Sequence, residues 1–150
     1  MKIRGFEKIS KQVDNADVQL PKRMTKHSVG YDFFSPVDVV IPAGEQFAVY
    51  TGIKSYFQID EALFFFSRSS WAIKHGIKLK NDVAVFEADY YNNPGNEGEA
   101  IITLVNVSDK NFEMKKGDRF CQAVFQKILL ADGDDADGDR LGGVGSTGTR

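Results

Sequence analysis

The chain has 150 residues, a length that suits a single domain, and 42% apolar with 27% charged residues is ordinary for a soluble globular protein. Lysine and arginine number 19 against 21 acidic residues, so a formal net charge of -2 argues against nucleic acid or an anionic membrane as partner. A single cysteine excludes an internal disulfide framework and a clustered cysteine zinc site. No apolar run is long enough for a signal peptide or a membrane span, and we expect a cytoplasmic protein.

Short strands separated by turns dominate the pattern along the chain. Fourteen glycines and twelve phenylalanines, with little helical periodicity, favour strands joined by tight turns. Residues 10–26 are polar and predict an irregular lead-in, and residues 92–96 (Asn-Asn-Pro-Gly-Asn) predict a turn. We therefore expect an all-β sandwich or barrel with one short helix. The predicted strands are residues 2–9, 37–41, 46–51, 53–57, 62–66, 82–86, 100–107 and 119–130.

The short helix is predicted at residues 67–75, because serines follow the apolar run 62–66 and Gly76 supplies a stop. The run 62–66 has the continuous apolar character of a strand buried on both faces. The segment Ser67-Arg68-Ser69-Ser70 lies where strand passes into helix. Free backbone amides, hydroxyls and a forked cation together favour a phosphate site there. Serine capping of the helix is the simpler alternative, but it leaves the arginine and the second serine unexplained.

Carboxylates beside apolar residues are further candidates for chemistry. Asp32 lies between Tyr31 and Phe33, either as a turn residue or as a carboxylate held near a metal. Glu87 and Asp89 would point to one face of a regular strand. A carboxylate beside an apolar pocket can act as a general base on water. Two surface carboxylates at the end of a strand are the alternative.

We assign no chemistry to the histidines, the cysteine or the tryptophan. His27 and His75 lack the neighbours that a nucleophilic dyad needs, so we interpret both as non-catalytic. Cys121 lies in an apolar stretch that predicts a small buried thiol. Trp71, early in the helix, predicts a packing anchor.

The chain changes character after residue 130. Residues 132–139 are acidic and glycine-rich, and they predict a solvated linker because they offer too little apolar surface to pack. They match a calcium loop only loosely. Residues 141–148 form a glycine-rich tail whose backbone amides could wrap an anion. We accordingly expect a β-rich domain at residues 1–130 and a flexible arm at residues 131–150.

Five segments carry most of these candidates: residues 29–33 (Val-Gly-Tyr-Asp-Phe), 67–72 (Ser-Arg-Ser-Ser-Trp-Ala), 85–90 (Val-Phe-Glu-Ala-Asp-Tyr), 117–122 (Gly-Asp-Arg-Phe-Cys-Gln) and 142–148 (Gly-Gly-Val-Gly-Ser-Thr-Gly). Taken in order, they resemble the five motifs of the trimeric dUTP diphosphatases (dUTPases). The resemblance extends from Gly30 to Gly148 and so covers nearly the whole chain.

The resemblance implies an all-β jelly-roll that assembles as a homotrimer. It implies hydrolysis of dUTP to dUMP and pyrophosphate with Mg2+, a reaction that keeps uracil out of DNA. In that family each active site draws on three subunits. The first, second and fourth motifs come from one subunit, the third motif from another, and the glycine-rich tail from the third. Residues 131–150 would therefore complete the site of a neighbouring subunit.

Individual site residues follow from position in the motifs. Glu87 falls where the family has an aspartate that positions the attacking water, and Asp32 resembles the carboxylate that meets the water shell of the metal. Asn81 resembles the residue that reads the uracil edge, and Tyr90 the ring that packs on deoxyribose and excludes a 2′-hydroxyl. The implied phosphate and tail contacts are Arg68, Ser69, Ser70, Gln122, Arg140, Gly145, Ser146 and Thr147.

Several positions depart from the family pattern. Glu87 adds a methylene to the usual aspartate, Ala84 replaces a glycine of the uracil hairpin, and Val144 replaces a phenylalanine that would cover the base. Arg140 lies one residue closer to the double glycine than the family arginine. Residues 91–97 are an insertion that predicts a longer turn.

Two other functions compete with this interpretation. The dCTP deaminases share the fold and the Arg-Ser-Ser signature, but they carry a further arginine and a glutamate where this chain has Ile73 and, roughly, Val105. The glycine-rich tail also favours a diphosphatase. A nucleotide-binding regulator that has lost turnover is the second alternative, motivated by the departures at Glu87, Ala84 and Val144.

Overall fold

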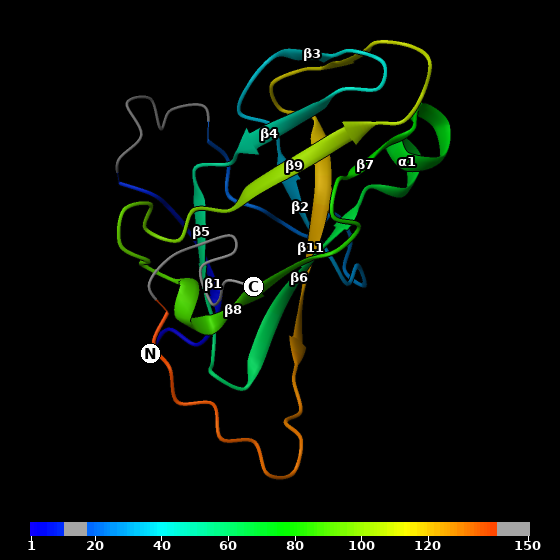
Figure 1. Cartoon of the computed structure of the whole chain (residues 1–150). Helices are drawn as coiled ribbons and strands as arrows, with labels where there is room; N and C mark the ends of the chain where they lie inside the picture. Colours follow the sequence, from blue (N-terminus) through cyan, green and yellow to red (C-terminus); the bar gives the residue numbers. More distant parts are fainter. Residues whose placement is uncertain (11–17, 141–150) are drawn as a thin grey trace.

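The computed structural model describes residues 1–10 and 18–140, which fold mainly into short antiparallel strands (Figure 1). Within those residues one α-helix, α1 (Ser69–His75), and a 3-10 helix at Ala88–Tyr90 interrupt the strands. The predominance of strands and the short helix confirm the predicted fold class. The strands are β1 (Gly5–Lys8), β2 (Tyr31–Phe34), β3 (Val39–Ile41), β4 (Gln46–Tyr50), β5 (Ile53–Tyr56), β6 (Glu61–Ser67), β7 (Ile77–Leu79), β8 (Ala84–Glu87), β9 (Ile101–Asn106), β10 (Phe112–Met114) and β11 (Arg119–Lys127).

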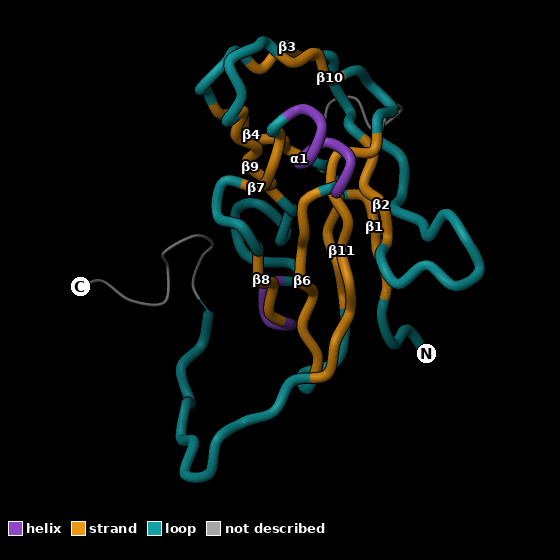
Figure 2. Tube along the Cα trace, turned by 90° about the vertical axis from the view of Figure 1, so that its right-hand side faces the viewer, coloured by secondary structure: helices purple, strands orange, loops and turns teal. Residues whose placement is uncertain are grey.

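Two sheets enclose the core. A four-stranded sheet has the order β2-β11-β6-β8, and a three-stranded sheet has the order β4-β9-β7, while β1-β5 and β10-β3 form separate pairs. Figure 2 shows β6, β11 and β2 side by side. Phe33, Phe65 and Phe120 from the first sheet are fully buried in one cluster with Ile102 and Leu104 from the second. The phenylalanine excess of the sequence therefore fills the space between the sheets, where each ring buries a large apolar area.

Strand β6 is buried on one face rather than on both. Leu63 and Phe65 are fully buried, whereas Phe64 and Phe66 are only half-buried. The core of this chain covers one side of the four-stranded sheet, so side chains alternate in exposure as they do in an antiparallel sheet with one packed face.

Helix α1 begins two residues later than predicted and ends where predicted. Arg68 occupies the N-cap position, and Gly76 ends the helix in the left-handed conformation at φ 67°. Trp71 is buried, with its ring 4.7 Å from that of Phe112, which confirms its predicted role as a packing anchor. Lys74 and the last residue of the helix, His75, place basic side chains at its negative end.

Three strands are not predicted from the sequence. β2 follows Gly30, which favours a turn, and β7 and β10 are only three residues long. Periodicity over so few residues carries no signal, and pairing with β11, β9 and β3 is what defines these strands.

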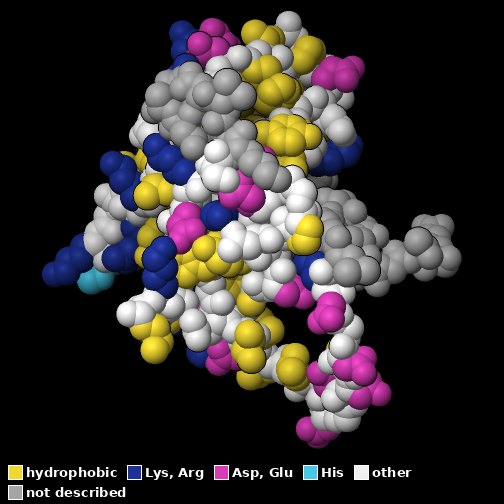
Figure 3. Space-filling view, turned by 90° about the vertical axis from the view of Figure 1, so that its left-hand side faces the viewer, with side chains coloured by type: hydrophobic (Ala, Val, Ile, Leu, Met, Phe, Trp, Pro, Cys, Tyr) yellow, Lys and Arg dark blue, Asp and Glu magenta, His cyan; other side chains and the backbone are white. Residues whose placement is uncertain are grey.

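The described part of the C-terminal arm projects from the domain beyond the end of β11 (Figure 1). Every residue from Ala131 to Asp139 is exposed, and Figure 3 shows acidic side chains gathered on the projecting segment. This exposure agrees with a solvated linker. The role of residues 131–150 in a neighbouring site stays a prediction. Over the described ranges, no helix is long and apolar enough to span a bilayer.

Candidate active site

The central strand β11 brings the first, second and fourth motifs together. Gln122 lies opposite Asp32 on β2 and opposite Phe66 on β6. Directly opposite residues share a face of an antiparallel sheet, so the Gln122 amide and the Asp32 carboxylate project from the same side. Because Arg68 follows β6 immediately, three distant stretches of sequence meet at this end of the sheet (Figure 2).

Two guanidinium groups accompany the Asp32 carboxylate. Arg119 Nη1 lies 3.3 Å from Asp32 Oδ2. Arg68 Nη1 donates to the backbone carbonyl of Arg119 at 3.0 Å, and its guanidinium lies 5.6 Å from the centre of the Trp71 ring. An excess of forked cations suits a polyphosphate. Arg119 has no role in the sequence-based assignment, because its pairing with Asp32 depends on the register of β2 and β11.

The serines of the second motif do not cap the helix. Arg68 is the N-cap residue and makes no side-chain cap hydrogen bond, while Ser67 Oγ accepts the backbone N–H of Leu79 at 3.0 Å. Ser69 and Ser70 occupy the first turn of α1, and within the described part of the chain neither hydroxyl has a hydrogen-bond partner. The capping alternative is therefore wrong, and both hydroxyls are available to a ligand.

A close approach of backbone to side chain explains the glycine of the first motif. A Cβ atom at Gly30 would lie 2.3 Å from Gln122 Oε1. Any side chain at residue 30 would displace the Gln122 amide from its place beside Asp32. Glycine is the residue that allows this approach.

The third motif passes from strand into a 3-10 helix. β8 ends at Glu87 and the 3-10 helix begins at Ala88, so the regular strand that would place Glu87 and Asp89 on one face does not extend to Asp89. The two carboxylates still converge, because both accept hydrogen bonds from the Arg140 guanidinium, with Asp89 Oδ1 at 2.7 Å from Nε. The Asp89 hydrogen bond is the main cause of a raised Arg140 pKa. Arg140 thus binds carboxylates of its own chain, and its predicted contact with phosphate stays a prediction.

The turn between β7 and β8, which belong to different sheets, carries the predicted uracil contact. Asn81 lies exposed in its turn, where its backbone carbonyl accepts the N–H of Val83 at 2.7 Å. Ala84 lies opposite Phe65 on β6 and belongs to the buried core. The methyl group of Ala84 therefore packs into the core.

Tyr90 is held on three sides. Its ring packs edge-on against Phe86, with centres 5.3 Å apart and planes at 89°. Its hydroxyl donates to the carbonyl of Glu99 and accepts from Asn96 Nδ2, both at 2.8 Å. Burial raises the Tyr90 pKa, so the hydroxyl is protonated at neutral pH. Asn96 and Glu99 escaped prediction because they reach Tyr90 only after the chain has turned back on itself.

Within one chain the two groups of site residues lie at opposite ends of β6. Glu87 pairs with Ala62 near the start of that strand, whereas Ser67, which pairs with Cys121, ends it. At a rise of about 3.3 Å per residue, the five steps from Ala62 to Ser67 span roughly 17 Å. Figure 1 shows the same separation between α1 and the 3-10 helix after β8. A general base acts within about 3 Å of the proton it takes, so the predicted base Glu87 and the predicted phosphate contacts lie too far apart within one chain to act on the same phosphate.

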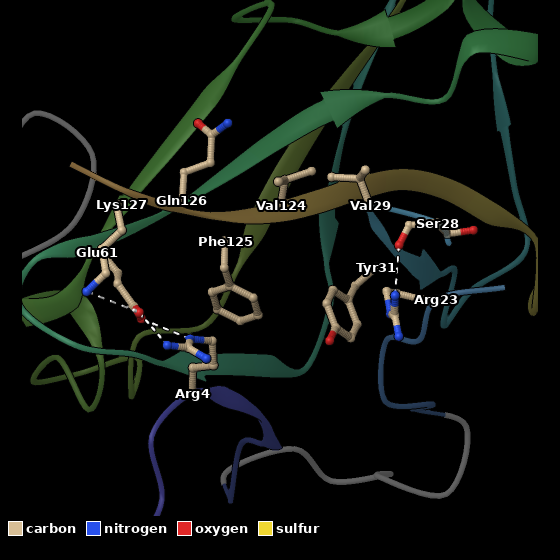
Figure 4. A pocket seen from close by; sticks show the side chains of 10 residues that line it. All are labelled: Arg4, Arg23, Ser28, Val29, Tyr31, Glu61, Val124, Phe125, Gln126 and Lys127. Atoms are coloured by element: carbon tan, nitrogen blue, oxygen red, sulfur yellow. Dashed lines mark hydrogen bonds and ion pairs between the residues drawn. The ribbon is translucent and has the colours of Figure 1, made fainter. Parts of the chain in front are cut away.

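A hollow beside the C-terminal half of β11 is not the predicted site. Figure 4 shows it lined by ten residues, none of them a predicted site residue. Its cations already have partners: Arg4 pairs with Glu61, Lys127 with Asp60, and Arg23 donates to the carbonyl of Ser28.

The remaining sequence-based assignments concern the cysteine, a histidine and three residues of the C-terminal arm. Cys121 is buried, as predicted, and burial raises its pKa well above the ordinary value, which opposes a thiolate role. The His75 ring packs 5.3 Å from that of Phe112, and its interpretation as non-catalytic stays a prediction. Gly145, Ser146 and Thr147 lie outside the described residues.

The donor set around Asp32 suits a hydrated metal. The described residues contain no cluster of three His, Cys, Asp or Glu side chains that could hold an ion directly. Mg2+ commonly keeps several waters and takes one or two carboxylates together with substrate phosphates. A single half-buried carboxylate beside the predicted phosphate contacts therefore fits a magnesium ion that would arrive with substrate phosphates.

Known structures share this architecture. The chain superposes on the dUTPase of Streptococcus mutans with a TM-score of 0.78 and 43% identity, covering 86% of this chain and 99% of that one. A dUTPase of phage phi11 of S. aureus, 16% identical, gives a TM-score of 0.72 with 91% and 97% of the two chains covered, which shows a shared fold. The protein is thus a jelly-roll-like β-protein of the kind found in dUTPases.

Sequence relatives define the family. The family model for dUTPase matches residues 16–147. The deoxyuridine 5'-triphosphate nucleotidohydrolase of Lactococcus lactis subsp. lactis (strain IL1403) is 45% identical over 150 residues, covering 99% of both chains. The chain belongs to the dUTPase family.

Proposed function

We propose that the chain hydrolyses dUTP to dUMP and pyrophosphate. The observation that carries the proposal is the alignment of Asp32 and Gln122 beside Arg68, an arrangement suited to a polyphosphate, in a member of the dUTPase family. In the proposed reaction a water oxygen bonds to the α-phosphorus while the bond to the bridging oxygen breaks and pyrophosphate leaves. Glu87 accepts the proton of that water.

The other residues bind and orient the nucleotide in this proposal. Tyr90 packs on the deoxyribose, and Asn81 reads the uracil edge. The phosphate contacts are Arg68, Ser69, Ser70 and Gln122, with Arg140, Gly145, Ser146 and Thr147 added by the arm. Asp32 would hold a hydrated Mg2+, and that ion would supply charge neutralisation on the triphosphate.

A shared site explains the distance between the two groups of residues. Glu87 and the Arg68–Gln122 cluster lie roughly 17 Å apart along β6 in one chain, given about 3.3 Å per residue. We therefore propose that a second copy brings its Glu87 to the phosphate cluster, in a homotrimer whose arm crosses to a neighbour. Light scattering should give three times the chain mass, and a monomer that is active at low concentration would contradict the shared site. A cytoplasmic location, without nucleic acid or membrane as partner, also stays a prediction.

The direct test of function is pyrophosphate release measured with dUTP, dTTP, dCTP and UTP in the presence of Mg2+. We expect release from dUTP in clear preference to the other three. Tight binding of dUTP without release would instead identify a nucleotide-binding regulator. Release of ammonia from dCTP would identify a deaminase.

A further inference from the structure

The insertion at residues 91–97 folds into a compact turn directly behind Tyr90. The backbone N–H of Asn93 donates to the carbonyl of Tyr90 at 3.0 Å. Across the turn the N–H of Asn92 donates to the carbonyl of Glu97, and the N–H of Glu97 donates to the carbonyl of Asn93, both at 2.9 Å. The inserted residues therefore form a hydrogen-bonded turn that contacts Tyr90, the predicted sugar-binding residue.

The orientation of the Asn96 amide is fixed by its neighbours. Asn96 Oδ1 lies 2.9 Å from the backbone nitrogen of Gly98 and 3.1 Å from Asn93 Nδ2. A backbone N–H can only donate, so the oxygen of Asn96 must face Gly98 and its nitrogen must face Tyr90 Oη at 2.8 Å. The Tyr90 hydroxyl in turn donates a hydrogen bond to the carbonyl of Glu99 and accepts one from Asn96 Nδ2.

The turn is anchored to strands outside the motif. The Glu97 carboxylate accepts the backbone N–H of Ser10 at 3.0 Å, the Ser10 hydroxyl at 2.8 Å and Lys54 Nζ at 3.2 Å. The Tyr91 hydroxyl donates to Glu7 on β1 at 2.7 Å. These bonds tie the insertion to β1 and β5, so Asn96 is presented from a fixed support rather than from a free loop.

We propose that Asn96 is a positioning residue that fixes the Tyr90 ring and thereby sets the discrimination between deoxyribose and ribose nucleotides. The inference rests on the proposed function, in which Tyr90 packs on the sugar. A side chain rejects an extra hydroxyl by occupying its space, and that rejection is strong only if the side chain cannot move aside. Phe86 restrains the ring from one side, and Asn96 with Glu99 restrains its far end.

The substitution Asn96→Asp removes one of the two hydrogen bonds of the Tyr90 hydroxyl. It keeps an oxygen for Gly98 and Asn93, but it replaces the nitrogen that donates to Tyr90 with a carboxylate oxygen that only accepts. The hydroxyl has a single proton, so it can donate either to this oxygen or to the Glu99 carbonyl, but not to both. We expect the ratio of kcat/KM for dUTP to that for UTP to fall about tenfold, the value of one good hydrogen bond. Asn111→Asp is the matched control, because the exposed Asn111 likewise uses Oδ1 to accept the Ala43 N–H, at 3.1 Å, and the charge change is the same. The control should leave the ratio unchanged.

A double-mutant cycle with Tyr90→Phe tests whether Asn96 acts through the hydroxyl. Tyr90→Phe alone should also lower the ratio, and Asn96→Asp should then add nothing further. An unchanged ratio in folded Asn96→Asp, or additive effects in the cycle, would overturn the inference. If Asn96→Asp does not fold, a ratio in folded Tyr90→Phe equal to that of the unmodified protein would overturn it as well.

Binding measurements separate this inference from the proposed function. Calorimetry with dUMP and UMP gives a sugar preference without turnover. Absence of pyrophosphate release from dUTP by the unmodified protein contradicts the proposed function. A dUMP preference that Asn96→Asp lowers still supports the role of Asn96, and a preference that it leaves intact refutes that role.

Discussion

Substitution of Glu87 tests the proposed proton transfer from the attacking water. Glu87→Gln keeps the size and hydrogen-bonding capacity of the side chain and removes the base. Loss of a general base costs about a hundred- to ten-thousand-fold, which corresponds to roughly 3 to 5 kcal/mol of activation free energy. The side chain is 58% exposed, and Asp89 still holds Arg140 in the variant, so we expect the stability to change by no more than about 0.5 kcal/mol. Calorimetry should show that dUTP and Mg2+ still bind.

The shorter side chain makes the sharper comparison. Glu87 ends β8, and its backbone is fixed by pairing with Ala62, so Glu87→Asp withdraws the carboxylate by about 1 Å. A misplacement of that size can cost about a hundredfold in rate, and we expect Glu87→Asp to lower the rate of pyrophosphate release under saturating dUTP. Release by Glu87→Gln as fast as that of the unmodified protein would refute the reasoning, and Asp89 would be the next candidate.

Two further predictions concern the arm and the inserted turn. Removal of residues 141–150 should abolish turnover and leave the assembly intact by light scattering; a truncated protein with full activity would show that the arm is dispensable. Hydrogen bonds from Ser10 lower the pKa of Glu97 to about 2 in the folded protein, from 4.5 in the unfolded chain. The ionised carboxylate therefore contributes its full stabilisation at pH values above 4.5 and loses it as the pH falls towards 2. The melting temperature of Glu97→Gln should therefore lie below that of the unmodified protein at pH 7, and the difference should shrink as the pH falls from about 4.5 towards 2. A difference independent of pH would contradict this assignment.

Local sequence signals were enough for much of the fold. Turn residues and short apolar runs predict most of the strands, and Gly76 predicts the end of α1. The other elements depend on contacts between residues far apart in the sequence. Strand β2 exists because it pairs with β11, although Gly30 and Asp32 predict a turn when read alone. The 3-10 helix at Ala88–Tyr90 likewise breaks an alternation that extends, in the sequence, to Tyr90.

The site shows a similar division. The motif residues at Asp32, Arg68 and Gln122 were identified from the sequence, and the sheet brings them together. The support for Tyr90 could not be predicted, because Asn96 reaches the ring only through a turn whose geometry depends on Ser10 and Lys54. Only the register of β8 on β6 shows how far Glu87 lies from the phosphate cluster.

Mixing two inactive variants tests the shared site most directly. Glu87→Gln retains the phosphate cluster, and Arg68→Ala retains the general base. If a site takes Arg68 from one subunit and Glu87 from another, random reassembly of equal amounts restores both groups in about one quarter of the sites of a symmetric trimer. We predict that the mixture, after dissociation and reassembly, recovers about a quarter of the pyrophosphate release of the unmodified protein. A mixture that stays as inactive as its components, although it forms mixed trimers, would contradict the account.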